Sequence, residues 1–394
     1  MVSCAASDKS AVAVEAARSR IEFANQLRGV AALAVVWLHV GIHYWYGKGF
    51  VFSTLGLANP PVPTDPPKWA SWSHAILSLG FDFPVIDLGS LGVALFFLIS
   101  GFVVPISLRK LKPGKFLLIR VIRIFPVYIL SMLLLALLWW MFAYFGIGGG
   151  RTDVTASMLI AQLLLVSDLF GWPPLDLVSW TLQIELKFYL VAALLYAVIA
   201  KRGLWGVLLF ALAVVVAALV LRLEAVTPLL MARVHPNAPF VIKQQLVQLA
   251  FVAYIFAGYV LWLFWTRKVS RREALLAVTG LWGLSNVAMF VCDVRGQQLF
   301  VVSFSQLMAL AIFVIAMTRW ASRRNLVLDG LATISYPLYT VHLTVGWSAL
   351  ALLERTGLPS FVSLITALLV VVFVAWFVHL VAERPSLRLI ERIK

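Results

Sequence analysis

The amino-acid sequence predicts an all-α polytopic membrane protein of about ten transmembrane helices, with one further short segment that is re-entrant or interfacial. Of its 394 residues, 62% are hydrophobic and 12% are charged, whereas a soluble globular domain has about 25% charged residues. The mean hydropathy of +0.96 agrees with this composition. Basic residues gather between long apolar segments. We therefore expect a lipid bilayer to surround most of the chain.

The net charge of +15 and the sequence pI of about 10.1 would suggest nucleic-acid binding in a soluble protein. In this chain the basic residues cap apolar segments, which is typical of cytoplasmic loops in membrane proteins. We therefore expect no nucleic-acid partner. Cys4 and Cys292 lie far apart in the sequence and offer neither a disulfide framework nor a metal site, so no metal is expected.

Apolar segments divide the chain in order. Residues 1–20 are small and polar, without the apolar region of a secretory signal, and are predicted to form a mobile tail. The segments predicted to cross the membrane are 26–44, 88–108, 124–145, 178–200, 204–223, 245–266, 273–292, 298–318, 330–351 and 360–382. A long loop rich in Pro, Trp and Gly, 45–87, follows the first segment, and a basic loop from Arg109 to Arg123 follows the second. Loops as long as 45–87 are often functional.

The charge of the loops decides the role of the segment 154–169, which is shorter than the 20 or so residues of a full span. If it does not cross, the basic loops share one side with both chain ends, including the predicted tail 386–394. If it crosses, the later basic loops fall opposite the earlier ones. The positive-inside rule favours the first arrangement. We therefore expect a multi-pass protein of the bacterial inner membrane with both termini cytoplasmic and 45–87 outside.

Two ionisable residues inside the first predicted segment indicate a functional site. Arg28 and His39 stand eleven positions apart in the stretch from Asn25 to Tyr44. At about 100° per residue this spacing returns them to one helix face, with roughly 16 Å of rise between them. Ionisable groups at such depth usually face a polar cavity or a partner. The alternative is an interfacial arginine and a packed histidine.

Other predicted helices carry polar groups at comparable depths. By rise along the helices, Glu185 lies at a depth similar to that of His39, and His342 lies about one turn deeper. A carboxylate beside an imidazole raises the basicity of the ring and fixes its tautomer, which suits removal of a proton from an alcohol. His39 and Glu185 are therefore predicted to be catalytic. An ion pair with Lys187 is the alternative for Glu185, and core packing is the alternative for Tyr339 and His342.

Arg120 and Arg123 lie one helical turn apart at the predicted inner membrane surface, just before Pro126. Two guanidinium groups on one helix face suit phosphate oxygens. The alternative is the anchoring role that basic residues have at cytoplasmic surfaces. On these residues alone anchoring is favoured, and phosphate binding stays open.

Six short motifs in chain order resemble those of a known family. They are Arg28-Gly29-Val30-Ala31 with His39, Gly92-Val93 with Phe96 to Phe102, Arg120 to Pro126, Trp180 to Tyr189 with Glu185, Ser335 to Tyr339 with His342, and Glu383-Arg384-Pro385. Together they resemble the acyltransferase-3 family of membrane O-acyltransferases. The resemblance implies a family domain of ten membrane helices over residues 21–385. Many members have aspartate where this chain has Asn25, so a role that needs a negative charge there is not carried over.

The resemblance implies transfer of an acyl group, most often acetyl, from cytoplasmic acyl-CoA to a hydroxyl of a glycan or other acceptor. We expect Arg28, Arg120 and Arg123 to bind the donor phosphates, with Ser100, Tyr339 and His342 also at the substrate site. His39 would remove the proton of the acceptor hydroxyl, and Glu185 would orient or support the ring. An acyl-enzyme on His39 or Ser100 is the alternative to direct transfer.

Other functions stay open at this point. Exopolysaccharide, O-antigen, another lipid-linked glycan or a secreted small molecule such as a macrolide are all compatible acceptors. A secondary transporter would also use buried His, Glu and Arg residues, although no internal repeat supports one. A metalloenzyme could use His39 and His43, which stand four apart, but no third ligand has a suitable spacing. Neither the acyl chain length nor the oligomeric state follows from the sequence.

Overall fold

The computed structural model describes residues 22–58, 65–83, 85–196, 201, 203–223, 226–233, 237–320 and 325–394. Within these ranges the chain forms helices and their connections, and none of the described residues forms a strand. The predicted all-α class is therefore confirmed. The predicted mobile tail 1–20 lies outside the described residues.

Long helices form most of the chain, and short helices stand between some of them. The N-terminal helix, Glu22–Tyr46, includes the π-helical turns η1 (Trp37–His43) and ends with α2 (Tyr44–Tyr46). The long helices that follow are α5 (Leu88–Leu108), α6 (Pro113–Tyr144), α8 (Ser179–Leu194), α10 (Leu204–Leu221), α12 (Ala238–Trp265), α13 (Arg271–Val291), α14 (Gly296–Ile315), α16 (Ser335–Glu354) and α17 (Ser360–Val378). The short ones are α3 (Lys48–Leu55), α4 (Lys68–Ser78), α7 (Ala156–Leu163), η2 (Ser167–Phe170), α11 (Val226–Arg233), η3 (Ala316–Trp320), α15 (Leu326–Thr333), η4 (His379–Glu383) and α18 (Arg384–Ile393).

Eight of the described helices are long and apolar enough to cross a membrane, which confirms the polytopic class. The remaining two predicted spans, α8 and α16, are present as helices but are not among these eight. The described part of α8 has 16 residues. The 20 residues of α16 include Tyr336, Tyr339 and His342, which make it less apolar. The two helices that fall short are therefore the ones that carry Glu185 and His342.

The extent of the basic loop was predicted wrongly. We expected a loop from Arg109 to Arg123, but α6 begins at Pro113, a position where proline is favoured because its missing N–H needs no partner. Arg120 and Arg123 consequently lie well inside α6, one helical turn apart. A sequence rich in cations and lacking apolar periodicity concealed this first part of the helix.

Short helices occupy the segments predicted as the long loop, the C-terminal tail and the segment that does not cross the membrane. The long loop 45–87 contains α3 and α4, and the predicted tail 386–394 forms most of α18, which packs against α6. Segment 154–169 contains only the short helices α7 and η2. Because eight residues of α-helix rise only about 12 Å, α7 cannot span a bilayer. This agrees with the prediction that segment 154–169 does not cross the membrane.

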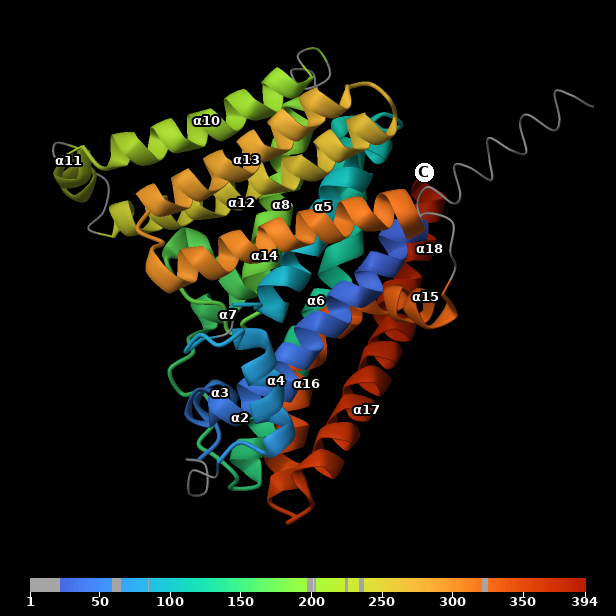
Figure 1. The fold of residues 1–394 in the computed structure, drawn as a ribbon. Helices are drawn as coiled ribbons and strands as arrows, with labels where there is room; N and C mark the ends of the chain where they lie inside the picture. The colour runs from blue at the N-terminus through green and yellow to red at the C-terminus, as the bar shows by residue number, and fades with distance from the viewer. Residues whose placement is uncertain are drawn as a thin grey trace, which may run out of the picture.

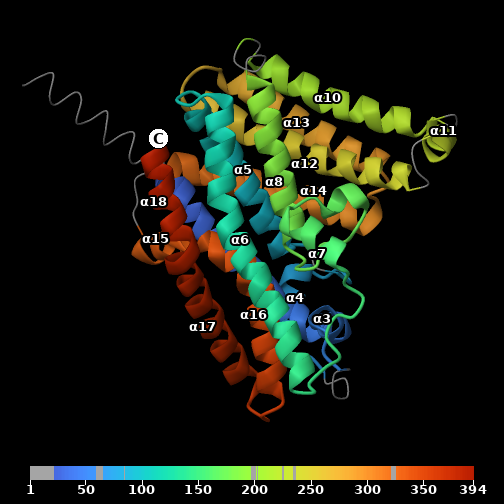
Figure 2. The same cartoon turned by 180° about the vertical axis from the view of Figure 1, so that it is seen from behind.

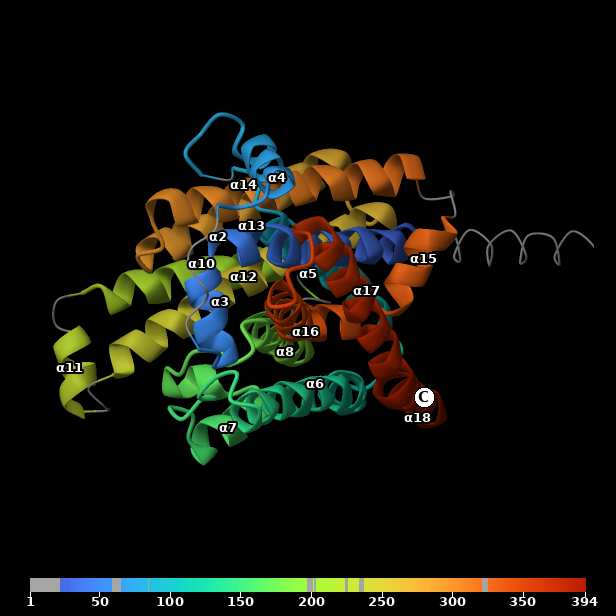
Figure 3. The same cartoon turned by 90° about the horizontal axis from the view of Figure 1, so that it is seen from below.

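The less apolar helices lie inside the bundle. Along one side α10, α12, α13 and α14 run next to one another, and α12 also packs against α5 and α8 (Figures 1 and 2). On the other side α16 packs against α17 and α6. Figure 3 shows α8 and α16 near the centre, between α6 and the N-terminal helix with α5. Their polar residues are thereby kept away from surrounding lipid.

Both described chain ends lie at one end of the molecule. The N-terminal helix begins close to α18, at the upper right of Figure 1. The first turn of α6 is also there, since Lys115 Nζ donates to the carbonyl oxygen of Lys394 (3.3 Å). We call this the basic end, defined by the start of the N-terminal helix, the start of α6 and α18. Residue 22 and the C-terminal helix α18 therefore lie at the same end of the bundle.

Two glycines let α5 and α12 pack closely. A Cβ atom at Gly101 would lie 1.9 Å from the carbonyl oxygen of Ile255, and one at Gly258 would lie 2.2 Å from that of Leu98. Both distances are far below van der Waals contact, so any side chain at either position would push the helices apart. Small residues allow such backbone contacts between membrane helices. The contact fixes the part of α5 that carries Ser100.

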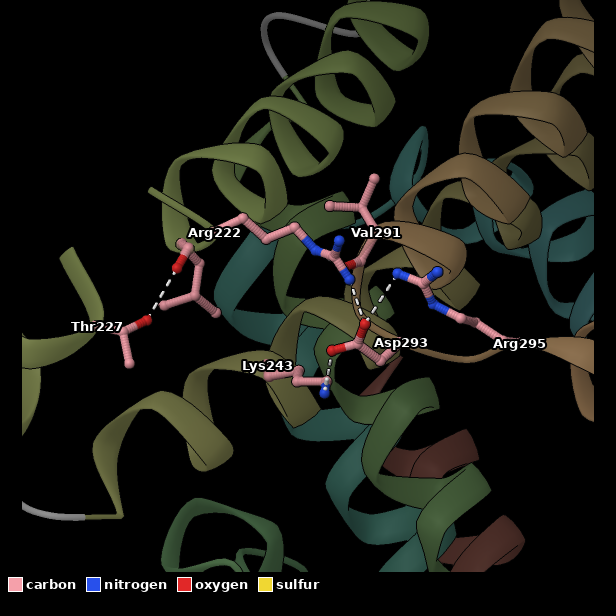
Figure 4. A network of polar contacts seen from close by, with 7 residues as sticks. Arg222, Thr227, Lys243, Val291, Asp293 and Arg295 are labelled. Atoms are coloured by element: carbon pink, nitrogen blue, oxygen red, sulfur yellow. Dashed lines mark hydrogen bonds and ion pairs between the residues drawn. The ribbon is translucent and has the colours of Figure 1, made fainter. Parts of the chain in front are cut away.

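A polar cluster joins the ends of α10, α12 and α13 that lie away from the basic end (Figure 4). The Asp293 carboxylate accepts hydrogen bonds from Arg222, Lys243 (2.7 Å) and Arg295 (3.1 Å). Arg222 also donates to the carbonyl oxygen of Val291 (2.7 Å). The hydrogen bond from Lys243 is the main reason why the pKa of Asp293 lies below its ordinary value. Because these groups are partly exposed, their contribution to stability is small.

Candidate active site

One cavity gathers most of the predicted site residues. It encloses about 910 Å³, counted up to and including the part that opens to solvent. The N-terminal helix, α5, α6, α8 and α16 contribute to its wall, as does η4. The predicted residues that line it are Arg28, Ser100, Arg120, Arg123, Glu185 and Tyr339. We call it the arginine cavity. The remaining predicted residues, His39 and His342, do not line it.

The three guanidinium groups reach this cavity from two helices. Arg28 comes from the N-terminal helix, where the neighbouring Gly29 permits close approach of α15: a Cβ there would lie 2.7 Å from the carbonyl oxygen of Leu328. Arg120 and Arg123 come from α6. Among the described residues, neither Arg28 nor Arg123 has a hydrogen-bond or ion-pair partner. Their positive charges are therefore free to meet an anion.

Arg120 is held mainly by aromatic rings. Its guanidinium carbon lies 5.1 Å from the centre of the Phe116 ring and 4.9 Å from that of Tyr189. One terminal nitrogen donates to Ser107 Oγ (3.3 Å). The side chain is only 6% exposed, and its Nε atom has no partner among the described residues. An unsatisfied donor in a buried guanidinium group suits an incoming phosphate oxygen.

Two carboxylates also line the arginine cavity, but other groups satisfy them. Glu185 accepts hydrogen bonds on Oε1 from Ser100 Oγ (2.8 Å) and from the Tyr189 hydroxyl. Glu383 pairs with His379 Nδ1 (2.7 Å) on the same helix. Three guanidinium groups against two carboxylates leave an excess of positive charge, and no described ion pair joins the two sets. The cavity is therefore suited to anions.

The structure does not form the predicted pair of His39 with Glu185. The described contacts of Glu185 go to Ser100 and Tyr189, and none reaches His39. Counting residues along each helix gave the depth of the two groups but not the direction in which each points. The alternative for Glu185 does not form either, because Lys187 pairs with Asp168 (2.5 Å).

His39 instead contacts His342. Nε2 of His342 lies 3.3 Å from Nδ1 of His39, and the ring centres are 5.1 Å apart. Nδ1 of His39 also lies 2.8 Å from the carbonyl oxygen of Val35, and Nδ1 of His342 lies 2.7 Å from that of Tyr339. His39 belongs to the π-helical turns η1, and π-helical insertions are frequent at functional sites. We call His39 and His342 the histidine pair.

These contacts select one arrangement of protons. A carbonyl oxygen can only accept, so Nδ1 carries the proton in both rings. In its neutral form His342 therefore has an unprotonated Nε2, which shares the Nδ1–H of His39 as a second acceptor beside the closer carbonyl oxygen of Val35. Nε2 of His39 is then the remaining lone-pair atom, and no described residue binds it. Of the four ring nitrogens in the histidine pair, this one alone remains able to accept a proton.

The α16 helix connects the histidine pair with the arginine cavity. Tyr339 lines the cavity, and its hydroxyl is 2.7 Å from Thr181 Oγ1 on α8. One turn further on, His342 bonds back to the carbonyl oxygen of Tyr339. Trp347 of α16 also donates to the carbonyl oxygen of His39 (2.9 Å). The same helix therefore shapes the cavity wall and holds the π-helical turn.

His43 does not complete a metal site. Its ring lies 5.3 Å from that of His39, in an edge-to-face arrangement. Among the described residues, no group of three or more His, Cys, Asp or Glu side chains could hold a metal ion. Cys292 is buried near the Asp293 cluster. The prediction that no metal is needed stays a prediction.

Three ionisable residues of the cavity wall were not predicted as site residues. They are Tyr189, Tyr336 and Glu383. Tyr189 stands four positions after Glu185, a spacing that places both on one helix face and could have indicated it. Glu383 is 5% exposed and lies in the π-helical turns η4, which the sequence does not show. Tyr336 donates to the carbonyl oxygen of Ile124 (2.8 Å), a contact that only the fold creates.

Comparison with known proteins identifies the family. The family model described as an acyltransferase domain, that of the acyltransferase-3 family, matches residues 21–380. Acyltransferase MdmB of Streptomyces mycarofaciens is 32% identical over 129 residues, which cover 31% of this chain and 33% of that protein. The match thus spans about a third of that relative's length. No solved structure matches the chain. The chain therefore belongs to the acyltransferase-3 family.

Proposed function

We propose that this protein transfers an acyl group, acetyl in the first instance, from acyl-CoA to a hydroxyl of an exopolysaccharide, O-antigen or other cell-surface glycan. The observation that carries the proposal is an arginine cavity with unpaired guanidinium groups, connected through α16 to a histidine pair with one free nitrogen. Family membership supports acyl transfer. The geometry supports an anionic donor and an acceptor that loses a proton.

The donor side of the proposal rests on charge and length. Coenzyme A carries phosphates at one end of a thin arm that ends in the thioester. Arg28, Arg120 and Arg123 suit the phosphates, since guanidinium groups form paired hydrogen bonds with phosphate oxygens. The arm would then extend towards His39, which is roughly 16 Å of helical rise from Arg28. Binding both ends of the donor would hold the thioester close to the base.

The chemical step uses the free nitrogen of His39. His39 Nε2 takes the proton of the acceptor hydroxyl while the hydroxyl oxygen forms a bond to the thioester carbonyl carbon. The carbon–sulfur bond then breaks, and the imidazolium of His39 returns its proton to the leaving sulfur. The carbonyl oxygen of Val35 and His342 Nε2 keep sharing His39 Nδ1–H throughout, so together they fix the ring orientation and favour its charged form. Direct transfer needs no covalent intermediate on Ser100.

The acceptor side of the proposal rests on the helices that follow His39. Trp69 of α4 packs against Trp37 (6.3 Å) and Trp45 (5.5 Å), next to the helix that carries His39. Trp72 on the same short helix is 67% exposed. Aromatic faces pack well on sugar rings, which favours a glycan over a macrolide. With the basic end in the cytoplasm of a bacterial inner membrane, these aromatic residues would face outward.

The proposal is tested with purified protein in proteoliposomes, supplied with labelled acetyl-CoA and candidate glycan acceptors. Label should appear in the acceptor only when protein and both substrates are present. Mass spectrometry of surface glycan from a deletion strain and its complemented parent should show loss and return of an acetyl group. Uptake of a substrate without turnover of acetyl-CoA would support a secondary transporter instead. Glycan that is unchanged in the deletion strain, with an acetylated small molecule lost, would overturn the glycan assignment alone.

A further inference from the structure

A second cavity lies next to the arginine cavity, on another side of α5. It has a volume of about 960 Å³, which includes space open to solvent, and α5, α8, α10 and α12 contribute to its wall. We call it the side cavity. Val104 lines both cavities, so α5 is their common wall at this point. None of the predicted site residues lines the side cavity.

The interior of the side cavity is apolar and rich in aromatic rings. Phe188 and Phe256 meet there edge to face, with ring centres 5.4 Å apart. Tyr259 stacks on Trp262 at 5.9 Å. The remaining wall consists largely of aliphatic side chains. A polar ligand such as a free sugar would lose its hydration here without replacement hydrogen bonds, so an apolar occupant is favoured.

Two cations stand at the mouth of the side cavity. The guanidinium carbon of Arg109 lies 5.9 Å from the centre of a Trp262 ring, and Lys268 Nζ lies 5.2 Å from one. Arg109 directly follows α5, and Lys268 follows the end of α12 by three residues. Neither pairs with a carboxylate of the described residues. Two exposed positive charges are thus gathered around one indole that is itself only 5% exposed.

The depth of the side cavity defines the shape of its occupant. Leu108, at the end of α5, and Gly101, seven positions earlier, both line it. This separation corresponds to roughly 10 Å of helical rise from the mouth into the apolar part of the bundle. The cavity therefore matches a molecule with an anionic head at the helix ends and a hydrocarbon tail that extends inward.

We propose that the side cavity binds an anionic phospholipid, with its phosphate between Arg109 and Lys268 and an acyl chain along α5 and α12. Two cations match one phosphodiester and one acyl chain, whereas acyl-CoA carries several phosphates and is better served by the three arginines of the other cavity. A bound chain would support Gly101 and Val104 of α5 from this side. The inference does not depend on the proposed acceptor or on the direction of acyl transfer.

The test is native mass spectrometry of the full-length protein after exchange into phosphatidylglycerol or phosphatidylcholine. We expect phosphatidylglycerol to be retained and to raise the Tm, and phosphatidylcholine to be displaced. The double variant Arg109→Gln/Lys268→Gln should bind phosphatidylglycerol about 25-fold more weakly, because each cation near an anionic lipid contributes about fivefold in affinity. The double variant Lys110→Gln/Arg272→Gln changes the net charge equally, at exposed basic residues outside the cavity, and should bind as the parent does.

The remaining measurements separate a lipid from other anions. Ala192→Phe adds bulk to the cavity wall without a change of charge and should also reduce retention of phosphatidylglycerol. Competition on the unmodified protein gives an answer even if a variant fails to fold. Displacement of the lipid by glycerol phosphate would show a simple anion site, and displacement by coenzyme A would show an extension of the donor site. Either result would overturn the proposal, as would equal retention of both lipids.

Discussion

The arginine cavity and the histidine pair both include a residue of the N-terminal helix, yet they satisfy their polar groups in opposite ways. In the cavity, Arg28 and Arg123 lack described partners and Arg120 keeps an unpaired Nε. In the histidine pair, three of the four ring nitrogens have partners and one is free. Unpaired cations are suited to hold an anion, whereas a single free nitrogen on an oriented ring is suited to move a proton.

This difference separates two measurable quantities. Changes in the arginine cavity should alter the affinity for the donor, and changes in the histidine pair should alter the rate at saturating donor. The Asp293 cluster provides a useful control, because each of its three cations already bonds to a carboxylate. An arginine-cavity variant that lowers only the rate at saturating donor would contradict these separate roles. A histidine-pair variant that lowers only donor affinity would contradict them as well.

The largest effect is expected for His39→Ala. General-base catalysis typically contributes about 10²- to 10⁴-fold, so the rate at saturating donor should fall by that range while donor affinity stays within about twofold. Single-turnover acetyl transfer and donor binding, measured on one preparation, check this. His43→Ala, in the same helix, is the matched control and should keep the parental rate. A folded His39→Ala protein that transfers acetyl at the parental rate would move the catalytic role elsewhere.

The next largest effect is expected for Arg120→Ala. Hydrogen bonds to charged groups are worth about 1.5–3 kcal/mol, so donor affinity should fall by about 10- to 100-fold. Arg120→Lys keeps the charge but loses the planar group stacked on Tyr189. Its donor affinity should therefore lie between that of the parent protein and that of Arg120→Ala. Equilibrium binding of acetyl-CoA measures both, with Arg222→Ala of the Asp293 cluster as the control. Unchanged affinity in Arg120→Ala would return this residue to an anchoring role.

The sequence predicts apolar helices more accurately than helix starts that are rich in cations. The segment 88–108 coincides with α5, because an uninterrupted apolar run is flanked by the N-cap Asp87 and by Arg109. The start of α6 was missed because cations in its first turns resemble a loop, although they form part of a helix that lines a cavity. Apolarity therefore defines where a helix lies in the membrane core, but not where the same helix begins outside it.

The site shows a second limit. The motifs identified the residues of both regions, and six of them do line one cavity. The partner of His39 could not be obtained this way, since Glu185 and His342 lie at comparable predicted depths on different helices. Which one faces His39 depends on how α8 and α16 are rotated and tilted, and long-range packing sets both. Residue spacing within one helix is informative, whereas pairing between helices is not encoded in spacing.

A smaller effect on rate is expected for His342. Partners that orient a reacting histidine typically contribute about 10- to 100-fold, by analogy with those that orient metal-bound histidines. His342→Leu removes one of the two acceptors of His39 Nδ1–H and leaves the carbonyl oxygen of Val35 as the other. It should lower the rate at saturating donor with little change in donor affinity. His342→Gln offers an amide oxygen in place of Nε2 and should restore part of the rate. Equal loss in both variants, together with a lowered Tm, would indicate a purely structural role.

The smallest effect is expected for Glu185→Gln, because the amide oxygen can still accept from Ser100 and Tyr189. Glu185→Ala removes both hydrogen bonds and frees Tyr189, whose ring stacks on Arg120. Net hydrogen bonds of about 0.5–1.5 kcal/mol imply a loss of donor affinity of about 2- to 10-fold for the alanine variant. Titration of acetyl-CoA against both variants distinguishes them. If either variant instead loses rate at saturating donor to the extent of His39→Ala, then Glu185 acts on the histidine pair, and the two regions function as one.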